Sequence, residues 1–501
     1  MLSFELFMYT LVVLLTLLLG VFAYFSNIIY QQHALYSHLP GPKRSSFFSG
    51  NINLVREAVT CNGVPFMQVA WELQEKYGPV FVLFIFHREF VFICDPVTIK
   101  TLLMSTEHSK SKNYNSLYGV YGIRFMGKGL VTEIDHDKWN ARRKLYNIAF
   151  HRKQLMDLMG DFNTSSDKLV LKLKPDADTD KPVQLMDGLR RTTLDVIAKA
   201  AFGISEEVIL KDSPFIDAVE TSMQGMHEQL RYPFDWMNPS RWKFRKQVKK
   251  SLLFLRDFGK DIITKSQKEQ LEGQHQTNNI MHSMLQCFHL DFYKFDMETM
   301  VDDFVTFFVA GQETTSNLLG FTILELGKRP DIAKRVQEEI DSIVGDKEFV
   351  EYQDVMKMEY TLLVFKEVLR LYPPATGTSR MCAHDLTSCG FHIPAGTSIQ
   401  MSHYITSRMK QFFKNPLEFD PDRFLRDDDH PMYAYFPFSL GVRSCVGQQF
   451  ALIEARVILA KLFQKFTFKL DPTQSFAILE QLTLKPKGEC TNFIYTRKMA
   501  A

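Results

Sequence analysis

Phe438-Ser439-Leu440-Gly441-Val442-Arg443-Ser444-Cys445-Val446-Gly447 is the stretch that decides the fold and the chemistry of this chain. It places one cysteine between two glycines, with an arginine two residues earlier, and a helix-forming segment follows. A cysteine at a helix N-terminus lies beside backbone N–H groups and the positive end of the helix dipole, which favour its thiolate. Gly441 permits a tight turn, and Gly447 lets a flat ligand lie against the backbone. These features predict a thiolate that binds the iron of a haem.

A single cysteine is more often a small buried apolar residue without chemistry. The spaced pattern F-x-x-G-x-R-x-C-x-G matches at five positions, however, and it resembles the haem loop of the cytochrome P-450 superfamily. The resemblance implies a mainly α-helical fold with small β-sheets (α+β) and a haem b (iron protoporphyrin IX) cofactor. It implies that Cys445 is the axial iron ligand and that Arg443 pairs with a haem propionate. Phe438 and Gly447 are expected to contact the cofactor as well.

A long buried helix is predicted from Val301 to Leu319, because apolar residues fall on one broad helical face. Within it, Glu313 and Thr314 place an acid and a hydroxyl in apolar surroundings, where they can carry protons. The alternative is a threonine bonded to its own helix and a solvated glutamate. The run A-G-x-E-T resembles the oxygen-activating segment of cytochromes P-450. The resemblance implies that Thr314 and Glu313 are the catalytic residues on the oxygen side.

Glu367 and Arg370 are three residues apart on a predicted helix, and Arg423 follows in the run Pro421 to Phe424. An ordinary surface ion pair, worth about 0.3–0.5 kcal/mol, is the simpler explanation of the first two. The superfamily joins its E-x-x-R pair to a later arginine. The resemblance therefore implies a structural triad of Glu367, Arg370 and Arg423 that locks the segment leading into the haem loop.

Trp139 and Arg143 lie one helical turn apart, so an indole N–H and a guanidinium can bind one carboxylate. A cation–π or packing pair is the alternative. The resemblance assigns both residues to the haem propionates, together with Arg380 and Arg443. It also suggests residues of the substrate pocket, which are Phe304, Ala310, Ala375, Thr376 and Leu482.

The composition is that of a protein with a sizeable core, since 46% of the 501 residues are hydrophobic and 13% are aromatic. The formal net charge of +2 is nearly balanced, whereas nucleic-acid binders carry a strong basic excess, so no nucleic-acid partner is expected. The seven cysteines have no regular spacing. This favours a reduced, cytosol-facing body over a disulfide framework.

Leu6 to Phe25 is a nearly unbroken apolar run, and about 20 such residues span a bilayer as a helix. No positive charge precedes the run, which favours a retained anchor over a cleaved signal peptide. Lys43 and Arg44 follow the run, which places the body of the protein in the cytosol. We expect an anchor at 1–30, a proline-rich hinge at 31–42 and the catalytic domain at 43–501. By resemblance the anchor lies in the endoplasmic reticulum membrane, where the glycosylation sequence at Asn163 would stay bare.

Short strands are predicted at Val80 to Phe86 and Phe90 to Cys94 as one hairpin, followed by a helix capped at Asp95. A second strand pair is predicted at Gly390 to Ile393 and Thr397 to Met401. The polar stretch Thr264 to Asn279 is expected to be a surface connection.

Three further signals are weaker. Cys382, His384, Cys389 and His392 suggest zinc, but their spacing is not that of a zinc site, so ordinary packing is expected. The basic run Arg241 to Lys246 fits either anionic lipid, an acidic redox partner or a solvated helix face. The stretch Met223 to Met237 fits either a membrane-dipping surface or a helix edge that faces the core.

Longer runs resemble the cholesterol 24-hydroxylase subfamily of microsomal cytochromes P-450, namely FVTFFVAGQETTSN, FKEVLRLYPPATGTSR, YFPFSLGVRSCVGQQFA and EQLTLKP. The resemblance implies a monooxygenase that uses O2, and NADPH through NADPH–cytochrome P-450 reductase. Its substrate would be lipophilic, with hydroxylation of an unactivated C–H bond in a sterol side chain. Fatty acids or xenobiotics are alternative substrates. A haem-thiolate isomerase and a non-catalytic haem sensor are alternatives of another class, although the Glu313-Thr314 pair favours a monooxygenase.

Overall fold

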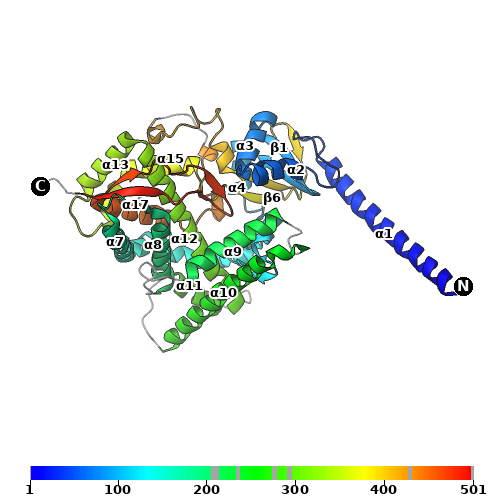
Figure 1. Ribbon diagram of the computed structural model, residues 1–501, viewed down its shortest axis with the longest axis horizontal. Helices are drawn as coiled ribbons and strands as arrows, with labels where there is room; N and C mark the ends of the chain where they lie inside the picture. Colours follow the sequence, from blue (N-terminus) through cyan, green and yellow to red (C-terminus); the bar gives the residue numbers. More distant parts are fainter. Residues whose placement is uncertain are drawn as a thin grey trace.

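The computed structural model describes residues 2–204, 214–232, 237–272, 279–289, 296–426 and 432–497 of the chain. Helices dominate, as expected, and the strands form small sheets (Figure 1). The α-helices are α1 (Leu2–Leu35), α2 (Ile52–Val55), α3 (Phe66–Tyr77), α4 (Pro96–Met104), α5 (His136–Ala149), α6 (Arg152–Asp157), α7 (Met159–Leu173), α8 (Leu185–Phe202), α9 (Pro214–Arg231), α10 (Trp242–Leu271), α11 (Ile280–His289), α12 (Met297–Lys328), α13 (Pro330–Ile343), α14 (Tyr352–Lys357), α15 (Glu359–Leu371), α16 (His403–Thr406) and α17 (Gln448–Lys465).

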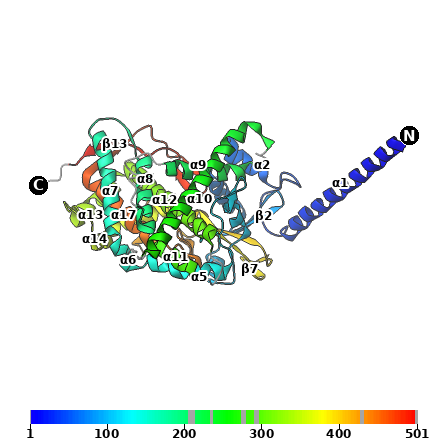
Figure 2. The same ribbon diagram turned by 90° about the horizontal axis from the view of Figure 1, so that it is seen from below.

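The first helix stands apart from the rest of the molecule. Figures 1 and 2 show α1 projecting from one end of the body. Residues Phe4–Leu35 are apolar and long enough to cross a bilayer, and none of the apolar window is buried against the protein. The helix also continues beyond residue 30, so it includes part of the segment expected to be a hinge. An anchor remains the interpretation of this helix, on length and composition.

The largest sheet has four strands in the order β1 (Val80–Ile85), β2 (Arg88–Ile93), β9 (Ser398–Ser402) and β6 (Gly377–Met381). The predicted hairpin is confirmed, because β1 and β2 pair in antiparallel fashion from Val80 opposite Ile93. The predicted helix cap is confirmed too, since the carboxylate of Asp95 accepts from the backbone N–H of Thr98 over 2.8 Å.

The predicted pairing of the strands at 390–393 and 397–401 is wrong. The strand β8 (Phe391–Ile393) pairs with β7 (Leu386–Ser388), whereas β9 lies parallel to β2 and antiparallel to β6. Two backbone hydrogen bonds explain the difference. The N–H of Gly396 donates to the carbonyl of Cys382, and the N–H of Cys382 donates to the carbonyl of Thr397. These bonds direct the chain from β8 toward the end of β6.

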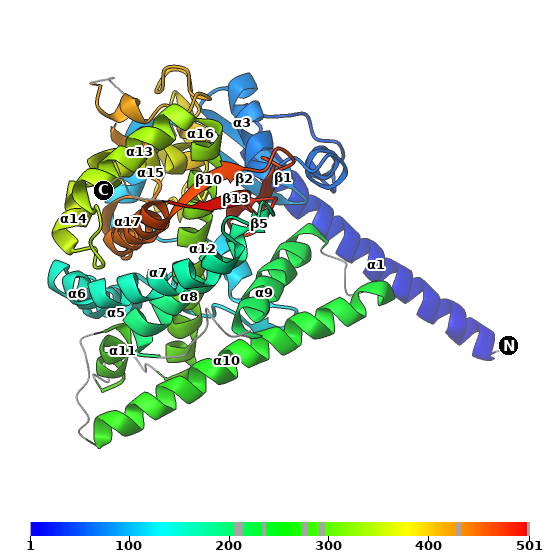
Figure 3. The same cartoon turned by 60° about the vertical axis from the view of Figure 1, so that its left-hand side comes forward.

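The remaining strands form two small sheets and one two-residue pair. The strands β10 (Phe466–Leu470), β13 (Thr491–Thr496) and β5 (Val183–Gln184) form one sheet, and β11 (Ile478–Glu480) and β12 (Leu484–Pro486) form a hairpin. The strands β3 (Gly119–Val120) and β4 (Ile123–Arg124) make the short pair. The stretch from Thr264 was expected to be a connection, but α10 continues through it to Leu271 and residues 273–278 lie outside the described part. Figure 3 shows α10 as a long helix with α9 alongside.

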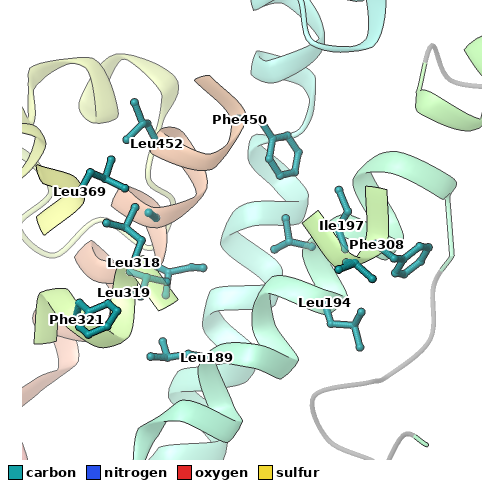
Figure 4. Close-up of a cluster of buried hydrophobic side chains, with 14 of the residues drawn as sticks. Leu189, Leu194, Ile197, Phe308, Leu318, Leu319, Phe321, Leu369, Phe450 and Leu452 are labelled. Carbon is teal, nitrogen blue, oxygen red and sulfur yellow. The ribbon is translucent and has the colours of Figure 1, made fainter. Parts of the chain in front are cut away.

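The core is built around α12, which is longer than the helix predicted there and is buried along most of its length. It packs against α8, α10, α15 and α17. Figure 4 shows apolar side chains gathered from these helices, namely Leu189, Leu194 and Ile197 of α8, Phe308, Leu318, Leu319 and Phe321 of α12, Leu369 of α15, and Phe450 and Leu452 of α17. The segment that carries Glu313 and Thr314 is therefore held rigidly against the helix that follows Cys445.

Two acids near the start of α12 were not singled out from the sequence. Asp302 accepts hydrogen bonds from the guanidinium groups of Arg124 and Arg256. Asp303 accepts from Arg142 over 3.0 Å and from the hydroxyl of Tyr146 over 2.6 Å. Because both carboxylates are fully buried, these contacts fasten the 124–146 region onto α12.

Candidate active site

The loop before α17 has a backbone that depends on glycine. Gly441 has a φ of 69°, in the left-handed region, and a Cβ there would lie 2.1 Å from the carbonyl oxygen of Leu103. The backbone N–H of Cys445 donates to the carbonyl of Phe438 over 2.8 Å. The helix α17 has Gly447 as its N-cap, so Cys445 lies at the start of a helix, as the sequence predicted.

Cys445 is enclosed by protein and yet has accessible surface, so it opens onto an internal space. Burial raises the pKa of the Cys445 thiol, whereas the backbone N–H of Gly447 and the guanidinium of Arg143 lower it. The expectation that the helix start by itself favours the thiolate is therefore wrong for the polypeptide alone. A bound metal cation deprotonates a coordinating thiol outright, so a thiolate at Cys445 would need such a cation beside it.

Four cations lie near one another beside this loop. Burial lowers the pKa of Lys110 well below its usual value, and the charges of Arg380, Arg443 and Arg143 lower it further. The guanidinium of Arg143 donates to the carbonyl of Ser444 over 2.7 Å, which places it against the cysteine loop. Lys110 was not singled out from the sequence, since nothing around it forms a motif.

Trp139 lies between two of the predicted cofactor-binding arginines. The Arg443 guanidinium is 3.9 Å from the centre of its ring, and that of Arg143 is 5.9 Å away. The cation–π pair that the sequence left open is therefore present. It does not use the donors at the edge of either guanidinium, so it is compatible with a carboxylate ligand.

The cation cluster fits a group with two acidic arms. The Nη2 atoms of Arg380 and Arg443 are buried and have no hydrogen-bond partner among the described residues. Burial and the charge of Arg380 lower the pKa of Arg443 to about 9. The charge of Glu133 acts in the opposite direction on Arg443, but its carboxylate is bound to Arg142 over 3.1 Å. Two carboxylates from a ligand would supply the missing acceptors and the missing negative charge, so the residues present fit the propionates of haem b.

Thr314 and Glu313 do not bind each other. The Thr314 hydroxyl donates to the carbonyl of Ala310 over 2.8 Å, as in the alternative that the sequence left open. Glu313 is buried rather than solvated, and its carboxylate accepts from the Thr483 hydroxyl over 3.1 Å, with Nζ of Lys485 at 3.9 Å. Ala310 is exposed within an otherwise buried stretch of α12, so the helix opens onto an internal space one turn before Thr314.

The three residues of the expected triad lie together and are buried. Glu367 binds Arg370 through two bonds of 2.8 Å and accepts from Nε of Arg423 over 3.0 Å. Arg370 also donates to the carbonyls of Ser407 and Pro416. The simpler explanation of an exposed surface pair does not hold, because neither Glu367 nor Arg370 has accessible side-chain area.

A cavity of about 240 Å³ lies near the cation cluster, and it includes two of the expected pocket residues, Thr376 and Leu482. Its wall also contains Tyr114, whose ring lies 4.2 Å from Nζ of Lys110. Ala375 is exposed. Phe304 has no accessible area and packs against Phe202, Phe258 and Phe308, so it is a core residue rather than a pocket wall.

Other sequence signals have structural explanations. No group of three metal-binding side chains occurs in the described residues, and Cys382 is buried. Met223 and Met226 are buried, so this part of the 223–237 stretch faces the core, whereas Phe234 and Trp236 lie outside the described residues.

The glycosylation sequence gives no information on orientation. The Asn163 amide is buried and donates to the carbonyls of Met159 and Val350 over 2.8 and 3.0 Å. A glycan needs an accessible amide, so the site stays bare on either side of a membrane.

Comparison with known proteins identifies the family. The sequence pattern described as cytochrome P450 matches residues 40–492. The chain belongs to the cytochrome P450 family. Membership implies haem iron as cofactor and O2 as a substrate, and the family's members related to this chain are monooxygenases.

Relatives come from animals and plants. The chain is 30% identical to cytochrome P450 4d2 of Drosophila melanogaster over 454 residues, which is 85% of this chain and 88% of that protein. It is 31% identical to cytochrome P450 3A6 of Oryctolagus cuniculus over 420 residues, 80% of this chain and 81% of the relative. It is 29% identical to 11-oxo-beta-amyrin 30-oxidase of Glycyrrhiza uralensis over 413 residues, 79% and 77% of the two chains.

Proposed function

We propose that this cytochrome P450 is a membrane-anchored monooxygenase that hydroxylates an unactivated C–H bond in a sterol side chain. In this proposal Cys445 ligates the haem iron, and Arg380, Arg443, Arg143 and Trp139 bind its propionates. The bound haem would supply the oxygen-activating chemistry. The observation that carries the proposal is the buried cation cluster beside an enclosed cysteine, in which the Nη2 donors of Arg380 and Arg443 have no partner among the described residues.

The chain's own residues have distinct tasks in this proposal. The cations hold the cofactor edge in place, and Gly441 and Gly447 let the loop approach its face. Ala310 leaves room beside α12, and the Thr314 hydroxyl and the Glu313 carboxylate hold and move protons on that side. Glu367, Arg370 and Arg423 fix the segment that leads to Cys445.

The sterol assignment rests on the resemblance of the quoted runs and on the character of the cavity. Pockets for drug-sized ligands measure about 300–1,000 Å³, so the cavity of about 240 Å³ would hold only one end of a sterol. A relative named as an oxidase of 11-oxo-beta-amyrin is consistent with a polycyclic substrate. Relatives named only as cytochromes P450 leave fatty acids and xenobiotics as the second candidate class.

We further propose that electrons come from NADPH through a flavoprotein reductase and that α1 anchors the chain in the endoplasmic reticulum with the body in the cytosol. None of the apolar window of α1 is buried against the protein, which supports an anchor. Lys43 and Arg44 after the helix support the cytosolic side.

The test is reconstitution of the purified full chain in lipid vesicles with the reductase, NADPH and a panel of sterols, fatty acids and drugs. Mass spectrometry should find one oxygen atom from labelled O2 in a hydroxylated sterol. The Cys445→Ala variant should lose both product and the thiolate-type spectrum of the reduced carbonyl complex, and the exposed Cys61→Ala variant should keep both. Product from fatty acids or drugs alone would overturn the sterol assignment, and rearranged product without labelled oxygen would indicate an isomerase.

A further inference from the structure

The hairpin β11–β12 joins the cavity wall to the buried acid of α12. Gln481 and Leu482, at the tip of the hairpin, line the cavity. The next residue, Thr483, donates its hydroxyl hydrogen to Glu313 over 3.1 Å. The backbone N–H of Leu484 donates to the carbonyl of Pro374, which fixes the tip beside the segment that contains Thr376. The cavity contact and the contact to Glu313 thus come from two adjacent residues, Leu482 and Thr483.

Two side chains hold the Glu313 carboxylate toward the hairpin. Besides the Thr483 hydroxyl, Nζ of Lys485 lies 3.9 Å from the same carboxylate oxygen. The side chains of Lys485 and Glu313 are only 10% and 3% exposed, so solvent screens this pair weakly. The amide of Asn317, one turn further along α12, donates to the Thr483 hydroxyl over 3.3 Å and fixes its orientation.

Glu313 therefore faces the hairpin, while the hydroxyl of its neighbour Thr314 donates to Ala310. For the acid to pass a proton toward Thr314, its carboxylate has to leave Thr483 and Lys485 first. A ligand that displaces Leu482 also shifts its neighbour Thr483, and this weakens the hydrogen bond from Thr483 to Glu313. The hairpin can thus connect filling of the cavity to the position of the acid.

We propose that Thr483 and Lys485 are positioning residues that keep Glu313 retracted until a ligand contacts the hairpin tip. This inference rests on the proposed role of Glu313 in proton delivery. It concerns the position of one carboxylate, so it requires no redox partner or cofactor beyond those of the monooxygenase. Its consequence is that O2 consumption stays low while the cavity is empty.

The experiment compares ligand-free NADPH oxidation and peroxide release in the reconstituted full-length holoprotein and its variants. The variants Lys485→Met and Thr483→Val should raise both rates by about 3- to 10-fold, as expected when one hydrogen bond or ion pair that restrains the acid is removed. Lys485→Arg should restore the low rate. The matched control is Lys487→Met, because Lys487 is exposed, lies just beyond β12 and has no ion pair within the described residues.

A double-mutant cycle shows whether the two residues act through Glu313. In the Glu313→Gln background, Lys485→Met and Thr483→Val should cause no further change. The C–O stretching band of the reduced carbonyl complex should gain a second component in Lys485→Met, and this component should be absent when Glu313 is also changed. That spectroscopic signature would not arise from a purely structural contact between the hairpin and α12.

The outcomes separate this inference from the proposed function. If product formation and the thiolate-type spectrum are retained but the ligand-free rates do not rise, the positioning role is overturned. The same holds if the rise persists in the Glu313→Gln background. Loss of the thiolate-type spectrum in the unaltered protein would instead overturn the proposed function itself.

Discussion

Replacement of Glu367 by glutamine tests whether the segment before the cysteine loop depends on a buried charge. The carboxylate accepts four hydrogen bonds, two from Arg370, one from Arg423 and one from the backbone N–H of Asp420. Glutamine has nearly the same shape, but its NH2 group faces guanidinium donors and its charge is zero. Two buried guanidinium groups would then lose their common anion.

The expected loss follows from this burial. Breaking a buried ion pair by removing one partner costs about 3–5 kcal/mol, because it leaves an uncompensated charge. The unfolding entropy of about 2.1 cal/mol/K per residue, taken over residues 40–492, gives about 1 kcal/mol/K. The apparent melting temperature of Glu367→Gln should therefore fall by about 3–5 °C.

The measurement is thermal unfolding at one fixed scan rate, followed by circular dichroism and by the carbonyl spectrum. A fixed rate is needed because a cofactor-binding protein does not unfold as a simple two-state system. Asp422→Asn is the matched control, since Asp422 precedes Arg423 but pairs with Arg335 at 2.7 Å in an exposed position. The free energy of unfolding of this control variant should fall by no more than about 1 kcal/mol. Equal melting temperatures for the two variants would refute the reasoning, because burial would then not govern the cost.

Three more variants test the site and its surroundings. Arg443→Leu should weaken haem retention, measured by haem transfer to apomyoglobin, yet raise the melting temperature of the haem-free chain, because burial and Arg380 lower the Arg443 pKa to about 9; a fall in both would contradict this. Gly441→Ala should lower the haem content of the folded protein, because a side chain at the left-handed backbone of this position costs at least about 1–2 kcal/mol; normal haem content would contradict it. Burial raises the Glu480 pKa from 4.5 to about 7, so its stabilising contribution is present below pH 4.5 and lost as pH rises through 7. The melting temperature of the unaltered protein should therefore fall between pH 5 and 7.5 relative to Glu480→Gln; parallel curves would contradict the shift.

Local patterns predicted local structure well. The hairpin at β1 and β2 and the cap at Asp95 were predictable because alternation, turn residues and a capping side chain act over a few residues. The pairing of β9 was not, because backbone bonds to Cys382, distant in sequence from the predicted turn, decide it. The resemblance also named residues that the structure brings together, such as Glu367 and Arg423.

The residues that sequence reasoning missed share one property, which is that their role depends on neighbours far along the chain. Lys110 becomes notable only beside Arg380 and Arg443. Thr483 and Lys485 become notable only because β12 packs along α12 at Glu313. A lone lysine or threonine carries no spacing from which such a partner can be inferred.

Dependence on distant neighbours also explains why the sequence wrongly predicted a low pKa for the Cys445 thiol. A helix start and a nearby arginine favour a thiolate, and both are present at Cys445. Enclosure by the surrounding helices opposes them and prevails, so the pKa of the thiol is raised rather than lowered. The cations at Arg380, Arg443 and Lys110 carry the same penalty. The excess of buried positive charge destabilises the chain alone, and the dianionic edge of a bound cofactor would relieve it. The Cys445 thiol is neutral in the chain alone, and a bound metal cation would deprotonate it. The cation cluster thus suits an anionic cofactor, at a cost in stability to the chain without one.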